Sequence, residues 1–237
     1  VSNADGGAGI VANDGTSGAI VNSGTITVDE PYNPTDTDND GDLDGPFALG
    51  SGRFGIRTLG QHTGNVTNSG EIEVEGNDSA GIWLGGPLNG AFTNDGTVSV
   101  LGDGSVGVHL EDVTGNVRLA GTVAVKGEDA VGAELTGDVN GALVVQGTIS
   151  ATGYRKTTAP TDTSKLDADD LLQGGSALVI EGDVTGGIVL AVPPKDEDSS
   201  DADEDSDGIP DADEGSAKVL SYGAAPAMVI GAADRDV

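Results

Sequence analysis

The chain has 237 residues, of which 40 are glycine, and only 3% are aromatic, so a core built on large rings is excluded. Ten Lys and Arg against 40 Asp and Glu give a formal net charge of −30, which repels nucleic acids and anionic membranes, and no apolar run approaches the roughly 18 residues of a membrane span. The absence of cysteine excludes disulfides and cysteine-bound metals, so any bound metal needs oxygen ligands, which calcium prefers.

A repeat of 25–26 residues runs through the chain. Each unit contains the pattern Gly-(Thr/Glu)-(Ile/Val)-x-(Val/Ala), in which apolar and polar side chains alternate as in a half-buried strand. The pattern begins at Gly24, Gly70, Gly96, Gly121 and Gly147. The first spacing is 46 residues, so it contains an insertion of about 20 residues.

Two further short strands complete each unit. One begins with a small residue followed by alternating apolar residues, at Gly55, Gly81, Gly107, Gly132 and Ala177. The other is found at residues 19–22, 65–68, 91–94, 116–119, 142–145 and 187–190. Three short strands per unit, separated by Gly, Asn or Asp, predict an all-β fold: a parallel β-helix (β-solenoid) of about six coils that forms a single domain over residues 1–237.

The strand within the glycine pattern supplies the predicted core. Its inward residues stack from coil to coil at about 4.8 Å, and Ile72, Val98 and Val123 are members of one such column. A second column contains Asn22, Asn68 and Asn94, which we expect to form an internal ladder of hydrogen-bonded amides.

Three acidic insertions interrupt the repeat, at residues 29–50, 154–173 and 193–216, and they contain 22 of the 40 acidic residues. Within the third, residues 203–214 match D-x-[DN]-x-[DN]-G-x5-E over all twelve positions. In such a loop alternate carboxylates point to one centre, Gly208 permits the bend, and the final Glu closes the site. The alternative is a solvated acidic linker. The predicted calcium ligands are Asp203, Asp205, Asp207, Asp211 and Glu214.

The first insertion contains a second calcium-type loop at residues 36–44. Phe47 stands where the closing Glu would be, so we expect weaker binding completed by a backbone carbonyl and water. The predicted ligands are Asp36, Asp38, Asp40, Asp42 and Asp44. The second insertion has no such spacing.

One outward column is the candidate for contact with a ligand or partner. It contains Arg57, Trp83 and His109, followed by Glu134 and Val179. Trp83 is either a platform for a sugar ring or partner protein, or an ordinary surface ring over the glycines that follow it. No second carboxylate accompanies Glu134 at a catalytic separation, so we expect no enzymatic activity.

The coils GIWLGGPLNGAFTNDGTVSV and GVHLEDVTGNVRLAGTVAV resemble passenger β-helices of bacterial autotransporters (type V secretion). The stretch LLQGGSALVIEGDVTGGIVLAVPP, with the downstream DSDGIPDADEG, is similar to large alphaproteobacterial members of that class. The D-x-D-x-D-G loops resemble thrombospondin type 3 calcium repeats. The resemblance implies a location at the bacterial cell surface or outside the cell.

These features predict a structural, calcium-stabilised β-solenoid that serves in adhesion, surface extension or self-assembly into fibres. Its partners would be further copies, other cell-surface proteins or glycans, without nucleic acid and without membrane insertion of this segment. The first coil begins without a capping helix and a seventh begins at Ala227, so either the native protein continues in both directions or copies associate. We expect calcium-dependent end-to-end or lateral association of this segment. The alternative is a calcium-dependent, carbohydrate-active β-helix enzyme, a polysaccharide lyase or hydrolase.

Overall fold

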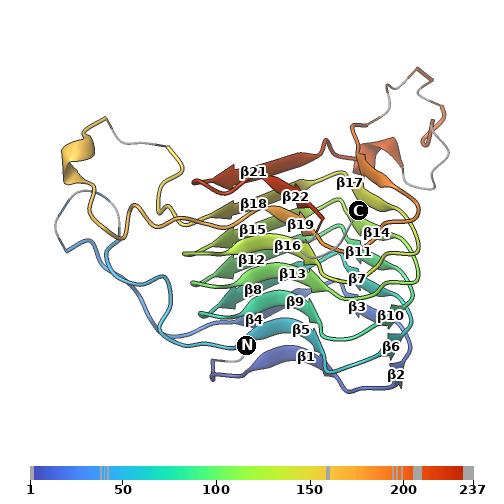
Figure 1. The fold of residues 1–237 in the computed structure, drawn as a ribbon, viewed down its shortest axis with the longest axis horizontal. Coiled ribbons are helices and arrows are strands. Elements are labelled where there is room, and N and C mark those ends of the chain that lie inside the picture. The colour runs from blue at the N-terminus through green and yellow to red at the C-terminus, as the bar shows by residue number, and fades with distance from the viewer. Residues whose placement is uncertain are drawn as a thin grey trace.

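The chain winds into a stack of parallel coils, and this confirms the predicted parallel β-helix (Figure 1). The computed structural model describes residues 3–37, 39, 41, 43–158, 161–193, 195, 197–198, 200–204 and 210–231. Each coil passes in turn through three sheets, whose strands pair only with the equivalent strands of the coils above and below. The described residues form six full coils, and the first strand of a seventh follows them.

The three sheets are named by their order within a coil. The first sheet contains β1 (Ala8–Ala12), β5 (Phe54–Thr58), β9 (Ala80–Leu84), β13 (Val106–Leu110), β16 (Val131–Leu135), β19 (Leu178–Ile180) and β22 (Met228–Ile230). The second sheet contains β3 (Ile20–Asn22), β7 (Val66–Asn68), β11 (Phe92–Asn94), β14 (Val117–Leu119), β17 (Leu143–Val145) and β20 (Ile188–Leu190). The third sheet contains β4 (Thr25–Val28), β8 (Glu71–Glu75), β12 (Thr97–Leu101), β15 (Thr122–Lys126), β18 (Thr148–Thr152) and β21 (Lys218–Tyr222).

A fourth, narrow sheet lies at the corner between the first and second sheets. It consists of the two-residue strands β2 (Thr16–Ser17), β6 (His62–Thr63) and β10 (Leu88–Asn89). Single bridges from Leu88 through Val113 and Val139 to Val184 continue it along the stack. The repeat pattern does not predict this sheet, because two residues are too few to show an alternation of apolar and polar side chains.

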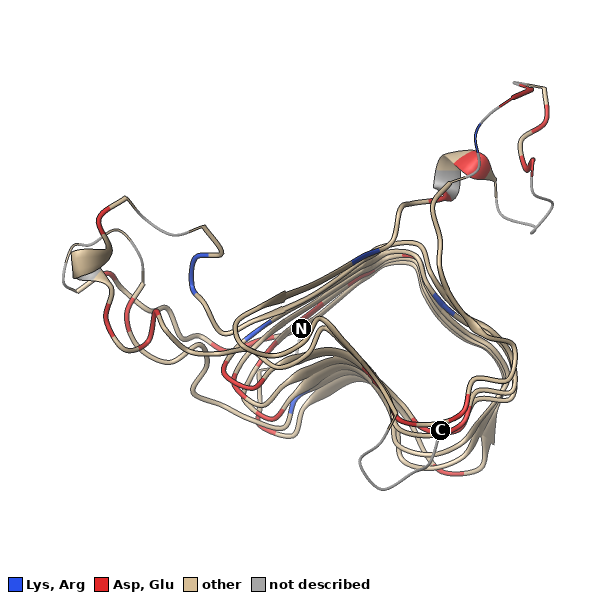
Figure 2. Cartoon of the chain, turned by 45° about the horizontal axis from the view of Figure 1, so that its top comes forward, with Lys and Arg blue, Asp and Glu red and all other residues tan. Residues whose placement is uncertain are grey.

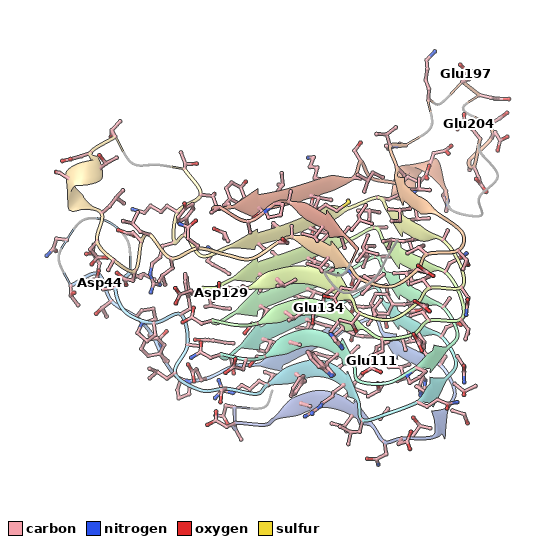
Figure 3. All side chains as sticks on the ribbon, in the orientation of Figure 1. Asp44, Glu111, Asp129, Glu134, Glu197 and Glu204 are labelled. Atoms are coloured by element: carbon pink, nitrogen blue, oxygen red, sulfur yellow. The ribbon has the colours of Figure 1, made fainter. Side chains whose placement is uncertain are left out.

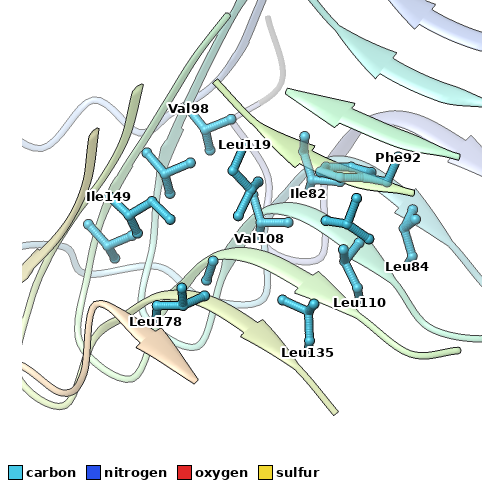
Figure 4. Close-up of a cluster of buried hydrophobic side chains, with 14 of the residues drawn as sticks. Ile82, Leu84, Phe92, Val98, Val108, Leu110, Leu119, Leu135, Ile149 and Leu178 are labelled. Atoms are coloured by element: carbon cyan, nitrogen blue, oxygen red, sulfur yellow. The ribbon is translucent and has the colours of Figure 1, made fainter. Parts of the chain in front are cut away.

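The register of the third sheet agrees with the predicted columns. Val98 pairs with Ile72 on one side and with Val123 on the other, and all three are fully buried. Large apolar residues of the other sheets, such as Phe92 and Leu110, fill the same interior (Figure 4). One hydrophobic core therefore runs along the stack and joins the coils.

The glycine that opens the repeat pattern is required by close contact between coils. At Gly96 a Cβ atom would lie 2.0 Å from the carbonyl oxygen of Gly70 in the coil below. At Gly121 it would lie 1.9 Å from the carbonyl oxygen of Gly96. Since neither backbone can move without breaking the ladder, only glycine fits this corner.

The predicted asparagine ladder is present in the interior. Asn22 Nδ2 donates to Asn68 Oδ1 at 2.7 Å, and Asn68 Nδ2 donates to Asn94 Oδ1 at 2.8 Å. The same column continues as Leu119 and Val145 in the next two coils. The amides satisfy one another along the axis, so the buried polar groups do not destabilise the core.

Outside the coils the structure has two short 3₁₀ turns, η1 (Thr163–Lys165) in the second insertion and η2 (Asp211–Asp213) in the third. Across the part of the chain that the structure describes, no helix has the length and apolar character needed to cross a bilayer.

Substitution of adjacent residues on β12 tests the register. Val98→Asp places a charge in the core without a partner, and we expect a loss of at least about 3 kcal/mol in the free energy of unfolding. Ser99→Asp, on the exposed face of the same strand, should change it by less than about 0.5 kcal/mol. Chemical denaturation followed by circular dichroism measures both, and equal destabilisation would refute the register.

Candidate metal and ligand-binding sites

The first and second insertions leave the stack at the same corner and meet beside it (Figure 1). The first follows β4 and the second follows β18, with three strands of the third sheet between them. Gly45 N donates to Asp169 Oδ2 at 2.7 Å, and Arg155 donates to the Gly45 carbonyl. The Arg155 guanidinium also lies 4.4 Å from the centre of the Phe47 ring. These contacts join two segments that are more than 100 residues apart in sequence.

Three carboxylates at this junction form the one metal-type group found among the described residues: Asp44, Asp167 and Asp169 each place an oxygen within 4.8 Å of the others (Figure 3, where Asp44 is labelled). Asp44 was among the predicted calcium ligands, whereas Asp167 and Asp169 were not. Their insertion lacks calcium-type spacing, and only the fold brings it to Asp44. No local sequence signal could have identified this group.

The two aspartates of the second insertion share a hydrogen bond. The bond to Asp169 raises the pKa of Asp167, and the bond from Asp167 lowers the pKa of Asp169, which also accepts from Gly45 and lies near Arg155. Asp167 is therefore the more readily protonated carboxyl of the pair.

The predicted loop at residues 36–44 is held by its own backbone. Asp36 accepts from the amides of Asn39 at 2.7 Å and Gly41 at 3.2 Å, and Asp44 accepts from the amide and hydroxyl of Thr37. Asp38, Asp40 and Asp42 lie outside the described residues. Of the predicted ligands that are described, Asp44 joins the metal-type group and Asp36 does not.

The third insertion lies on the other side of the stack from the first two (Figure 2), and Glu204, which it contains, is labelled in Figure 3. Glu204, Asp211 and Glu214 lie close to one another there. A hydrogen bond with Glu204 raises the pKa of Asp211 to about 6, and the charges of Glu204 and Glu214 add to the shift. Glu214 also accepts from Gln146, a buried residue of the coil. Asp205 and Asp207 lie outside the described residues.

One residue of this loop, Glu204, has a role that the motif does not give it. Glu204 occupies the second position, which the motif leaves unassigned, yet it also accepts from the amides of Glu197 at 3.0 Å and Asp198 at 3.1 Å. The amide of Asp203 donates to Asp201 at 3.2 Å. The pattern alone gave no reason to select Glu204.

A buried ion pair closes the base of the first insertion. Glu30 accepts from the amides of Leu49 and Gly50 and from Arg53 Nη1 at 3.0 Å, so one carboxylate joins the start of the insertion to its end. Arg53 also donates to the Glu75 carbonyl at 2.7 Å. Burial alone would raise the pKa of Glu30, but these hydrogen bonds outweigh it and hold the pKa below its ordinary value of 4.5.

In the outward column of the first sheet, the side chains of successive coils pack against one another. Arg57, Trp83, His109 and Glu134 occupy successive coils in register, as predicted. The rings of Trp83 and His109 stack with centroids 3.7 Å apart and an 8° angle. His109 Nδ1 lies 2.6 Å from Oε1 of Glu134, which is labelled in Figure 3.

Phe54 closes the other end of this column. Its ring meets the indole of Trp83 edge-on, with the two ring centroids 6.2 Å apart. The guanidinium of Arg57 lies 4.1 Å from the centroid of the Phe54 ring. One face of Trp83 is covered by His109, and its Nε1 lies so near Gly85 that a Cβ there would come within 2.9 Å. Most of the surface of the Trp83 ring is therefore in contact with other residues of the chain.

Comparison with protein families matches residues 1–127 to the model described as the BigA third pectate lyase-like domain. The match covers more than half of the 237 residues and takes in the first four coils with the first insertion. Comparisons with curated proteins and with solved structures gave no significant match.

Removal of the Glu30 charge tests the ion pair. Glu30→Gln leaves Arg53 buried with a weaker partner, and we expect a loss of about 2 kcal/mol in the free energy of unfolding at pH 7. The exposed Glu73→Gln on β8 is the matched control.

The pH dependence of this effect has a defined sign. Because the folded-state pKa of Glu30 is lowered, its stabilisation is complete above pH 4.5 and disappears as the pH falls through the folded value. The difference between wild type and Glu30→Gln in urea unfolding should therefore vanish in acid. A difference that persists unchanged would show that the carboxylate charge is not its source.

Proposed function

Because the chain belongs to the family of the BigA third pectate lyase-like domain, we propose that it is a structural β-helix at the bacterial cell surface or outside the cell. It serves there in adhesion, surface extension or self-association, with cell-surface proteins or glycans as partners. The observation that carries this proposal is the interior: a continuous apolar core and an amide ladder fill the stack from coil to coil. A rigid rod that presents its outer face and insertions is suited to surface contact.

The outer column supports this role over the enzymatic alternative. Hydrolysis or elimination in a polysaccharide needs a base, or a pair of carboxylates, aimed at the substrate. His109 is instead stacked under Trp83 and bonded to Glu134, and the described column contains no second carboxylate.

We also propose that the domain binds calcium at its acidic insertions. The junction of Asp44, Asp167 and Asp169 and the loop at residues 203–214 both offer carboxylate oxygens in groups, which is the donor set that calcium prefers. Calcium at these positions would neutralise the repulsion among acidic side chains and hold the insertions against the stack. A ligand present at 100 times its Kd stabilises the native state by about 2.7 kcal/mol.

Display of the domain on a non-adherent bacterium tests the function. Cells that carry the wild-type chain should bind to a host-cell layer or to each other, and cells that carry Val98→Asp should not, because that variant loses the fold. The purified chain should release no unsaturated or reducing sugars from acidic polysaccharides, with or without calcium. Sugar release together with absent adhesion would favour the enzyme.

Isothermal titration tests the metal. We expect calcium uptake at millimolar concentration or below, with Asp167→Asn removing binding at the junction and leaving the third insertion unaffected. Glu214→Gln should remove binding at the third insertion and leave the junction unaffected. Glu71 is an exposed residue on β8, and Glu71→Gln should leave calcium binding at both sites unchanged. The calcium proposal fails if wild type takes up no calcium under these conditions.

A further inference from the structure

A groove lies on the outer face of the third sheet, beside the joined insertions. Its cavity has a volume of about 510 Å³. The floor is made of small outward side chains from successive coils, Ser99, Ala124 and Ser150, and Tyr222 lines it further along the stack. Since these residues belong to successive coils, whose strands lie about 4.8 Å apart, the groove runs along the axis of the stack.

A second cavity of about 250 Å³ continues the groove under the insertions. Both cavities are lined by Leu101 and Lys126, and we call them together the insertion groove. The second cavity is lined in addition by three apolar residues of the first insertion and two cations of the second: Pro34, Leu43, Phe47, Arg155 and Lys156.

The charge of the insertion groove is opposite to that of the chain. Three of the ten Lys and Arg residues line it, and the described residues of its lining include no Asp or Glu. Neither Lys126 nor Lys156 forms a salt bridge with any described residue. In a chain of net charge −30, these cations make the described lining of the groove locally basic.

Arg155 fixes the wall of the second cavity. Its side chain is only 7% exposed, and its contacts to Gly45, Asp169 and the Phe47 ring hold it in place. Its Nε is buried and has no hydrogen-bond partner among the described residues. The cavity is therefore part of the same packed junction that joins the two insertions.

We propose that the insertion groove binds an extended acidic polypeptide segment that carries an apolar side chain. Lys126 and Lys156 would pair with its carboxylates, and the apolar side chain would enter between Leu43 and Phe47. The hydroxyl groups along the sheet, from Ser99 to Thr152, would hydrogen-bond to its peptide groups. This inference rests on the proposed function, because it names the class of surface partner that the domain contacts.

The lining favours this ligand over two others. An acidic glycan would satisfy the lysines and hydroxyls, but it has no group that matches the cavity formed by Pro34, Leu43, Phe47 and Leu101. A second copy of the chain would bring a charge of −30, far more than a short acidic segment carries, and this charge opposes its approach. An acidic segment with one apolar side chain matches both halves of the groove.

Fluorescence anisotropy with a labelled peptide in which Asp and Leu alternate tests the proposal. The peptide should bind wild type, and added salt should weaken binding. Lys126→Glu should weaken it about tenfold or more. Lys195→Glu, an equal change of charge on the third insertion at a side chain 85% exposed, should leave it unchanged.

A second pair of variants tests the apolar half. Leu43→Ser, which removes an exposed leucine that lines the groove, should also weaken binding, whereas Leu59→Ser, equally exposed but elsewhere, should not. A peptide with Ser in place of Leu should bind less tightly to wild type. Thermal melting of each variant confirms that the fold is intact.

Any of four results would overturn the proposal. Three are no binding of the Asp and Leu peptide, equal loss in Lys126→Glu and Lys195→Glu, and tighter binding of an oligosaccharide of uronic acids. The fourth is sedimentation that shows dimers formed through the groove. If the peptide fails to bind while displayed domains still adhere, the proposed function stands without this groove. If the peptide binds and adhesion is absent, the groove stands and the proposed function fails.

Discussion

The hydrogen-bonded register between parallel coils is the constraint on which the rest of the structure depends. Because each strand pairs only with its equivalent in the next coil, every residue lies over a residue of the same position. That rule makes glycine necessary where Gly96 lies over Gly70, and it lets Asn68 satisfy two neighbours at once. It also places Trp83 directly against His109, so that the outer column becomes a stack of rings.

The same constraint decides where the chain can leave the stack. An insertion within a strand would break the ladder, whereas an insertion at a corner leaves the pairing on both sides intact. The first and second insertions use the same corner, after β4 and after β18, and the third lies between the second and third sheets. The junction between Gly45 and Asp169 and the insertion groove both follow from that shared corner.

The sequence predicted the features that repeat. Val98 and Asn68 could be placed because their neighbours in space are also their counterparts one period away, so the period supplies the tertiary contact. The insertions have no counterpart in other coils. Asp167 meets Asp44 through loop conformations that no spacing encodes, and Glu204 approaches Asp211 from a position that the motif leaves open. Periodicity thus predicts the stacked coils, whereas the side-chain contacts within the insertions depend on loop conformations that the repeat does not encode.

The contact between the first two insertions has a mechanical consequence. Under tension along the axis, a stack of coils would normally peel open one strand at a time from its ends. Here Gly45 and Asp169 fasten the insertion after β4 to the insertion after β18, so the coils between them lie inside a closed loop of chain. Those coils cannot lengthen until the fastening separates. The junction therefore bears tension in parallel with the sheets, and the central coils bear less of that tension.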